Sequence, residues 1–153
     1  MVEVVAAAIL SKDFEAQKVF GSSGTWVLPA LEKLPTALAE ALFLIVRRGP
    51  QESGAGHWEF PGGKIEAGET KEVALLREID EELKMPIRII AELGFTDFAY
   101  SQKTLMIHLF LCQSLTNQFK LSDHDLHVWL KPSEFHQLNW AQADLDFMKY
   151  FVC

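Results

Sequence analysis

The densest run of charge in the chain lies at residues 66–82 and limits what this segment can form. Seven carboxylates occur there against two basic residues. On a helix, Glu78, Glu81 and Glu82 would stand at positions i, i+3 and i+4, within an arc of about 100°. Like charges this close destabilise an isolated helix, and a divalent cation would relieve their repulsion because Mg²⁺ prefers oxygen ligands. The alternative for the triplet alone is an ordinary solvated acidic face.

The same region predicts the longest helix, over about residues 70–83. Thr70 can cap its N-terminus, and Pro86 ends it. Apolar residues at spacings of three and four predict its buried face: Val73, Leu76, Ile79 and Leu83. Strands are predicted at residues 2–10, 41–48, 87–98, 105–112 and 127–130, and short helices near 132–135 and 141–151. This mixture of strands and helices predicts an α/β sandwich.

Length and composition fit one domain over residues 1–153, since a chain of this size with 49% hydrophobic residues can bury a core without disulfides. Two cysteines favour free thiols and a cytoplasmic location. No segment approaches the ~20 apolar residues of a membrane span. The net charge of −7 argues against a stable nucleic-acid partner. It does not argue against a nucleotide, because a bound cation can reverse the local sign.

A glycine-rich loop precedes the acidic helix. Gly62 and Gly63 follow Pro61, and glycines allow a backbone to approach a ligand closely or to present a carbonyl to a metal. Arg77 lies eight residues after Glu69. A pair between these two side chains could brace the loop against the helix.

Together, the loop and the helix resemble the Nudix hydrolase box. The box consists of a glycine, a glutamate, an arginine–glutamate–aliphatic run and a pair of glutamates. These positions are matched here by Gly63, Glu69, Arg77-Glu78-Ile79, Glu81 and Glu82. Lys84 replaces the glycine that normally serves the end of this helix, and Met85 takes the aliphatic place. A glycine there turns easily into the left-handed conformation. The replacement by Lys84 therefore affects how the chain leaves the helix, and it does not affect the metal chemistry.

Residues 57–70 are similar to the MutT-type branch of that family, which hydrolyses nucleoside triphosphates and removes oxidised ones. The similarity continues at residues 47–48, 129–135 and 140–144, with residues 12–40 expected as an insertion of unassigned role. It implies a Nudix α/β/α sandwich with a mixed β-sheet and a loop-helix-loop metal site. The implied cofactor is Mg²⁺, with Mn²⁺ as an alternative.

The resemblance also implies roles at matching positions. The metal ligands would be the Gly62 carbonyl, Glu78, Glu81 and Glu82, with Glu69 and Arg77 as supports of the catalytic group. One of the glutamates, or a carboxylate on another loop, would activate water. Some relatives carry such a carboxylate where Val128 stands; Asp123, His124 and Asp125 lie nearby, although a polar loop is the favoured interpretation of residues 123–127.

Substrate contacts are expected from basic residues and one acid. Arg47, Arg48 and Lys64 are candidates for phosphate binding, with solvent exposure as the alternative. Asp144 matches a position where MutT-type enzymes often read the edge of the base. A carboxyl group accepts hydrogen bonds when ionised and can also donate when protonated.

The expected activity is conversion of nucleoside triphosphates, such as 8-oxo-dGTP, to monophosphate and pyrophosphate. The alternatives are another diphosphate, namely a dinucleoside polyphosphate, a nucleotide sugar or the 5′ end of RNA, or a non-catalytic nucleotide-sensing module. The expected partner is the nucleotide substrate. No membrane association is expected, and the chain is expected to be a monomer or a homodimer. Base preference stays open.

Overall fold

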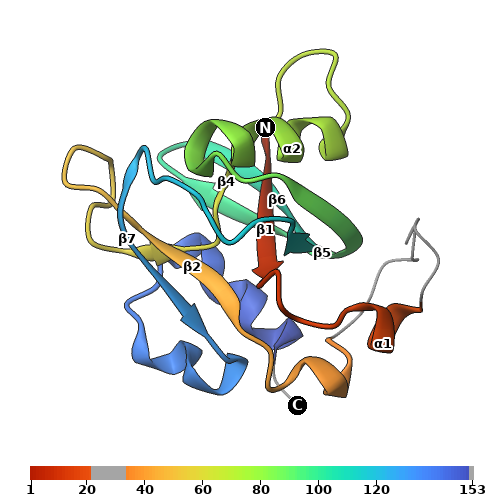
Figure 1. Cartoon of the computed structure of the whole chain (residues 1–153). Helices are drawn as coiled ribbons and strands as arrows, with labels where there is room; N and C mark the ends of the chain where they lie inside the picture. Colours follow the sequence, from red (N-terminus) through yellow and green to blue (C-terminus); the bar gives the residue numbers. More distant parts are fainter. Residues whose placement is uncertain (22–33, 152–153) are drawn as a thin grey trace.

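The computed structural model describes residues 1–21 and 34–151, apart from the side chain of Tyr100 (Figure 1). Residues 22–33 of the expected insertion therefore lie outside the described part. The chain forms β1 (Val2–Leu10), α1 (Gln17–Phe20), η1 (Thr36–Leu38), β2 (Phe43–Arg48), β3 (Trp58–Glu59), β4 (Gly62–Lys64), α2 (Lys71–Leu83), β5 (Ile87–Tyr100), β6 (Lys103–Ser114), β7 (His124–Leu130), η2 (Pro132–Gln137) and η3 (Gln142–Tyr150), where η denotes a 3₁₀ helix.

The strands form a mixed seven-stranded sheet in the order β3-β2-β1-β6-β5, with β4 paired to β1 and β7 to β2. β1 and β6 are parallel over the full length of β1, and the other pairs are antiparallel. The opposite edge of β1 is divided between two partners. Residues 4–6 pair with β4, whereas residues 9–10 pair with β2. The expected α/β sandwich with a mixed sheet is confirmed.

Helical segments cover both faces of the sheet (Figure 1). α2 packs on the face that carries Val5, Ala7 and Ile9. The other face packs against η2 and η3 through an aromatic group that includes Phe43, Phe60, Phe135, Phe147 and Phe151. Because β1 is covered on both sides, its residues 5–10 are all buried, as a central strand requires.

The apolar face predicted for α2 is wrong in part. Val73 and Leu76 are 53% and 45% exposed, whereas the buried residues are Ala74, Leu75, Ile79 and Leu83. Ala74, Glu78 and Glu82 follow one another at spacings of four along the helix and so share one side of it. Turning Glu78 and Glu82 toward the glycine loop buries that side and leaves Val73 and Leu76 in solvent.

Both ends of α2 are capped locally. Thr70 Oγ1 accepts a hydrogen bond from the Val73 N–H at 3.1 Å, which confirms the predicted N-cap. At the other end Lys84 takes the left-handed conformation, with φ 51° and ψ 42°, and its N–H donates to the Asp80 carbonyl. Lys84 therefore reproduces the helix exit that glycine usually provides.

Several strands differ in extent from the prediction. β5 and β6 form a longer hairpin than expected, and the short strand β4 was not predicted. β7 begins at His124, so most of the run 123–127 expected as a loop is strand. The predicted helices after residue 131 are 3₁₀ helices. Among the described helices, none has the length and apolar character needed to cross a membrane.

Candidate functional site

A cavity of about 550 Å³ opens beside the divided edge of β1. Its walls come from β1, the end of β2 and the loop after it, the β3–β4 segment, the end of α2, β6, the start of β7 and η3. Titratable side chains from these elements line it: Arg48, Glu52, Glu59, Lys64, Glu82, Asp123, His124 and Asp144. Residues far apart in the sequence thus form one strongly charged site.

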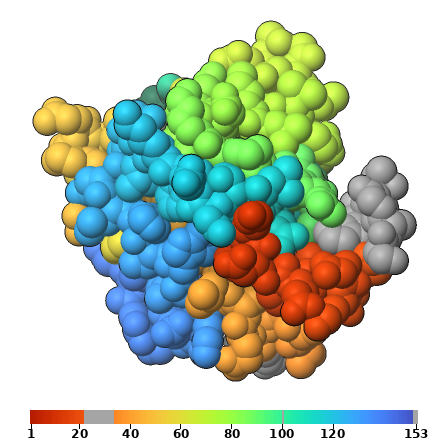
Figure 2. Space-filling view, in the orientation of Figure 1, coloured from red at the N-terminus to blue at the C-terminus, as the bar shows by residue number. Residues whose placement is uncertain are grey.

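The segment between β6 and β7 brings the last part of the site to α2. Figure 2 shows this segment lying against the helix. The Lys120 N–H donates to the Leu83 carbonyl at 2.8 Å, and the Ser122 N–H donates to the Glu82 carbonyl at 3.1 Å. These bonds satisfy carbonyls at the end of the helix and place Asp123 next to Glu82.

Arg77 ties the loop to the helix. Its Nε and Nη2 donate to the two carboxylate oxygens of Glu69 at 2.6 and 2.8 Å, and Nη2 also donates to the Lys64 carbonyl at 3.0 Å. The bonds from Arg77, together with the Glu66 N–H, lower the pKa of Glu69 to about 2. The expected brace between Glu69 and Arg77 is therefore present.

The two glycines of the loop are required by close packing. A Cβ at Gly62 would clash with the Val5 carbonyl, and one at Gly63 would clash with the carboxylate of Glu78. Strand β4 therefore fits between β1 and α2 only because these residues lack side chains. This packing sets Glu78 and Glu82 directly against the loop.

Glu78, Glu81 and Glu82 differ in how far their side chains are exposed. Glu78 and Glu82 have largely buried side chains, and Glu78 accepts a hydrogen bond from Arg77 Nη1 at 2.9 Å. Glu81 is 58% exposed and accepts from the same nitrogen at 3.2 Å. Arg77 thus holds Glu81 on the solvent side of the helix.

Glu82 has an unusual electrostatic environment. Burial and the nearby carboxylates of Glu59, Glu78 and Asp123 raise its pKa to about 9, and a backbone hydrogen bond from Gly62 offsets this only partly. Its Oε2 atom is buried without a hydrogen-bond partner among the described residues. Such a concentration of uncompensated carboxylate oxygens suits a hard divalent cation.

The sequence gives no sign that Glu59 belongs to the site, and it favours a polar loop around His124. Arg48 Nε donates to Glu59 Oε1 at 2.7 Å, and His124 Nε2 lies 2.9 Å from Glu59 Oε2. Strand β2 brings these residues together. Its Arg48 pairs with His124 of β7, and its Val46 pairs with Glu59 of β3. Such long-range pairing leaves no local signal in a sequence beyond polar residues at strand ends.

The predicted substrate residues fall in different places. Arg48 lines the cavity and also donates to the Ser53 carbonyl, and Lys64 lines the same cavity. Arg47 instead forms a two-point pair with Asp125 at 2.9 and 2.8 Å. Asp144 is buried in the cavity wall and accepts a hydrogen bond from the Phe60 N–H at 3.2 Å. Burial and the nearby Glu59 raise the pKa of Asp144 to about 8.

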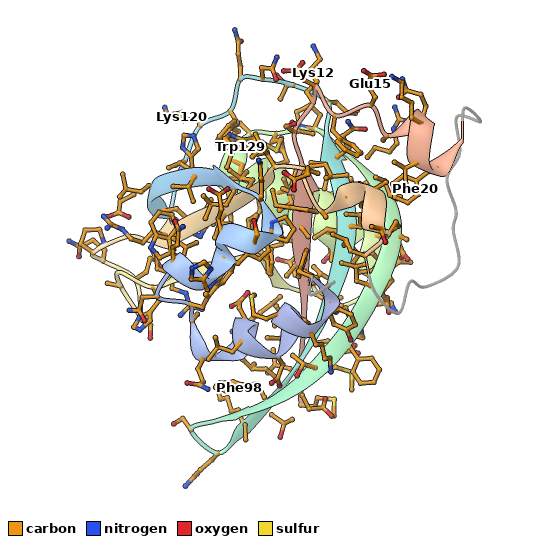
Figure 3. The ribbon with its side chains drawn as sticks, turned by 90° about the horizontal axis from the view of Figure 1, so that it is seen from below. Lys12, Glu15, Phe20, Phe98, Lys120 and Trp129 are labelled. Atoms are coloured by element: carbon orange, nitrogen blue, oxygen red, sulfur yellow. The ribbon has the colours of Figure 1, made fainter. Side chains whose placement is uncertain are left out.

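A second cavity of about 360 Å³ shares Arg48, Ser53, Leu105 and Ala143 with the first. Its remaining wall is largely apolar and includes Phe98, which Figure 3 shows close to η3. The two cavities therefore meet at Arg48.

Comparison with known proteins identifies the architecture. The NUDIX domain model matches residues 36–151, and the chain therefore belongs to the Nudix family. It is a hydrolase of phosphorus anhydride bonds. The expected family and enzyme class are thereby confirmed.

Similar proteins come from several organisms. "Putative 8-oxo-dGTP diphosphatase 2" of Mycobacterium tuberculosis is 34% identical over 108 residues, covering 66% of this chain and 72% of that protein. "CTP pyrophosphohydrolase" of Escherichia coli is 29% identical over 109 residues, covering 71% and 81%. The MutT protein structure from Methanosarcina mazei superimposes with a TM-score of 0.73 at 20% identity, covering 98% and 91%. The structure of the E. coli ORF135 protein gives 0.68 at 26%, covering 99% and 88%.

Nudix hydrolases generally need a divalent metal. Across residues 1–21 and 34–151, no three His, Cys, Asp or Glu side chains already surround one point closely enough to enclose an ion. The unpartnered Oε2 of Glu82 and the raised pKa of this group nevertheless fit a cation beside it. Water and substrate oxygens commonly complete such open sites.

Proposed function

We propose that the chain is a Mg²⁺-dependent pyrophosphohydrolase that converts nucleoside triphosphates, including oxidised ones such as 8-oxo-dGTP, to monophosphate and pyrophosphate. The observation that carries the proposal is the buried, unpartnered carboxylate of Glu82 at a cavity that also holds Arg48 and Asp144. The activities in the names of the similar proteins from M. tuberculosis and E. coli support this substrate class. We place the reaction in the cytoplasm, since Cys112 is a free buried thiol.

The ligands proposed for the cation are Glu78 and Glu82, with Glu81 and the Gly62 carbonyl as further members. When bound, Mg²⁺ neutralises phosphate charge and polarises the attacked phosphorus. Arg77 keeps Glu78 and Glu81 oriented by donating to both. Phosphoryl transfer depends mainly on such positioning and charge neutralisation.

Arg48 and Lys64 are the proposed phosphate contacts. Arg48 is held by Glu59 and the Ser53 carbonyl at the junction of the two cavities, so its guanidinium is fixed before a substrate arrives. Arg47 is engaged by Asp125 and is the weaker candidate.

Water activation requires a carboxylate that can accept a proton. Asp123 lines the cavity, whereas Asp125 is paired with Arg47. We therefore assign Asp123 to take the proton as water attacks phosphorus, while the phosphorus–oxygen anhydride bond breaks and pyrophosphate leaves.

Asp144 is the proposed reader of the base. With a pKa of about 8 it is mainly protonated at pH 7 and offers one donor and one acceptor. This pair matches a base edge that presents an acceptor beside a donor, such as N3 and N4 of cytosine or O6 and N1 of guanine. A panel of plain and oxidised nucleotides, run with the wild type and Asp144→Ala, tests the assignment. An unchanged base preference in the variant would contradict it.

A dinucleoside polyphosphate is the second candidate substrate. The cavity beyond Arg48 has space and apolar walls for a further group attached to the phosphates. Pyrophosphate release from triphosphates, compared with nucleotide release from dinucleoside polyphosphates, separates the two candidates.

The metal assignment is tested by replacing its carboxylates. We expect the double variant Glu81→Gln/Glu82→Gln to lose pyrophosphate release by at least about 100-fold, because removing an essential electrostatic contact costs roughly this much. Glu82→Gln alone should account for most of the loss, since Glu81 is exposed. Activity that survives in the double variant would overturn the site.

A further inference from the structure

His124 is buried more deeply than its position at the start of an outer strand requires. Its side chain is 3% exposed, and Nε2 lies 2.9 Å from Glu59 Oε2. The other oxygen of Glu59 is taken by Arg48, so Glu59 is held as a carboxylate that only accepts hydrogen bonds. Nε2 therefore carries the hydrogen that Glu59 accepts, and the other ring nitrogen, Nδ1, has no hydrogen-bond partner in the described chain.

This nitrogen lies near a second buried atom that has no partner. Nδ1 of His124 lies 3.9 Å from Oε2 of Glu82. Both atoms are buried without a hydrogen-bond partner, and they are two of the three such side-chain atoms in the described chain. Two buried polar atoms this close, with no hydrogen bond to either, are unfavourable unless a proton or a cation lies between them.

A histidine that donates one ring nitrogen to a carboxylate and presents the other to a buried carboxylate has the arrangement of a metal ligand. Histidines that bind metals almost always donate their second N–H to a carboxylate, carbonyl or water, which fixes the tautomer. Two metal–ligand bonds of about 2.1 Å span at most ~4.2 Å, so one ion can reach both atoms. Water and phosphate oxygens would fill the other positions.

We propose that His124 Nδ1 and the Glu82 carboxylate share a divalent cation, and that this nitrogen ligand makes the site prefer Mn²⁺ or a similar transition ion to Mg²⁺. Imidazole suits transition metals, whereas Mg²⁺ favours oxygen ligands throughout. The inference rests on the proposed metal-assisted hydrolysis and adds a ligand outside the acidic helix. Glu59, which is held by Arg48, fixes the orientation of the imidazole ring through its hydrogen bond with Nε2.

The decisive measurement is pulsed electron paramagnetic resonance of Mn²⁺ bound to the full chain. We expect a nitrogen coupling in the wild type that changes when the histidines are labelled with ¹⁵N. A proton held between Glu82 and His124, with Mn²⁺ bound by oxygen alone, gives no such coupling. Bound Mn²⁺ without nitrogen coupling would overturn the proposal, and this result needs no variant.

His124→Gln provides the matched variant. A glutamine amide can still donate to Glu59, but it removes the atom that faces Glu82. We expect the nitrogen coupling to disappear and the affinity for Mn²⁺, measured by titration calorimetry, to fall about 10-fold or more. The affinity for Mg²⁺ should change less than about 2-fold. Equal losses for both ions, or a coupling that persists, would contradict the assignment.

His127→Gln is the control, because His127 is exposed on the same strand and packs beside Phe119. It should keep both the nitrogen coupling and the Mn²⁺ affinity. Metal binding is measured here without turnover, so the two proposals can fail separately. Nitrogen coupling without nucleotide hydrolysis refutes the function, whereas hydrolysis without coupling refutes the histidine ligand.

Discussion

At the scale of single residues, the carboxyl groups of the site differ widely in how readily they ionise. Burial raises the pKa of both Glu82 and Asp144, while Arg77 lowers that of Glu69. Three carboxyl groups in one site thus have three different environments. The sequence shows that these groups are acids, but their state depends on neighbours brought in by the fold.

The raised pKa of Asp144 makes a prediction for stability against pH. In the unfolded chain this carboxyl titrates near its ordinary value of 3.8, and in the folded chain near about 8. The folded state therefore binds the proton more tightly, and the stability that Asp144 contributes is full below about pH 4 and lost as the pH rises through about 8. We expect thermal unfolding at pH 5, 7 and 9 to show a smaller fall in Tm with pH for Asp144→Asn than for the wild type. The difference between the two proteins should reach several degrees at pH 9. Parallel curves for the two proteins would contradict the pKa shift.

At the scale of elements, α2 shows how a functional demand can override an apolar pattern. Val73 and Leu76 lie at helical spacing with Ile79 and Leu83, and the pattern alone favours burying all four. The helix instead turns so that its glutamates meet the glycine loop, with Ala74 and Leu75 taking the buried places. The helix, its cap and most strands could be predicted, because periodicity and capping are local. The rotation of α2 could not, because it depends on β4.

Two alanine substitutions measure this rotation. Leu75 is fully buried, so Leu75→Ala should lower the free energy of unfolding by about 2–5 kcal/mol. The adjacent Leu76 is exposed, so Leu76→Ala should change it by less than about 1 kcal/mol. Urea denaturation of both variants checks the difference. A larger loss for Leu76 than for Leu75 would restore the apolar face predicted from the sequence.

The end of the same helix contains a residue in an unfavourable backbone conformation. Lys84 has φ 51°, where a side chain other than that of glycine costs about 1 kcal/mol. Lys84→Gly should therefore raise the unfolding free energy by up to about 1 kcal/mol without changing metal affinity. Denaturant titration and Mn²⁺ binding test the two halves of the statement. A loss of stability would mean that the lysine side chain makes a compensating contact.

At the scale of the whole molecule, the site is assembled from parts that only the sheet brings together. Glu59, Asp123 and His124 reach Glu82 because β3 and β7 flank β2. The acidic helix and its loop could be recognised from spacing within about 25 residues of sequence. The other half of the site depends on pairing between distant strands, which spacing does not reveal.

This assembly predicts that a cation stabilises the entire fold. A ligand present at about 100 times its Kd adds about 2.7 kcal/mol, which corresponds to several degrees in Tm for a chain of this length. Adding Mn²⁺ or Mg²⁺ should raise Tm by that amount, and a chelator should reverse the change. In Glu82→Gln the cation should have little effect on Tm. An equal rise in this variant would place the ion elsewhere.

The bonds from Lys120 and Ser122 to the last turn of α2 have a consequence for how the chain can vary. They make the segment before β7 a spacer of fixed length, with one end attached to the acidic helix and the other continuing directly into Asp123 and His124. Inserting or deleting a single residue between Ser122 and His124 would shift β7 in register relative to this attachment and turn His124 to the opposite face of the sheet. Changes of length in this connection are therefore far less tolerated than in the loop at residues 49–56, even though both connections lie at the surface.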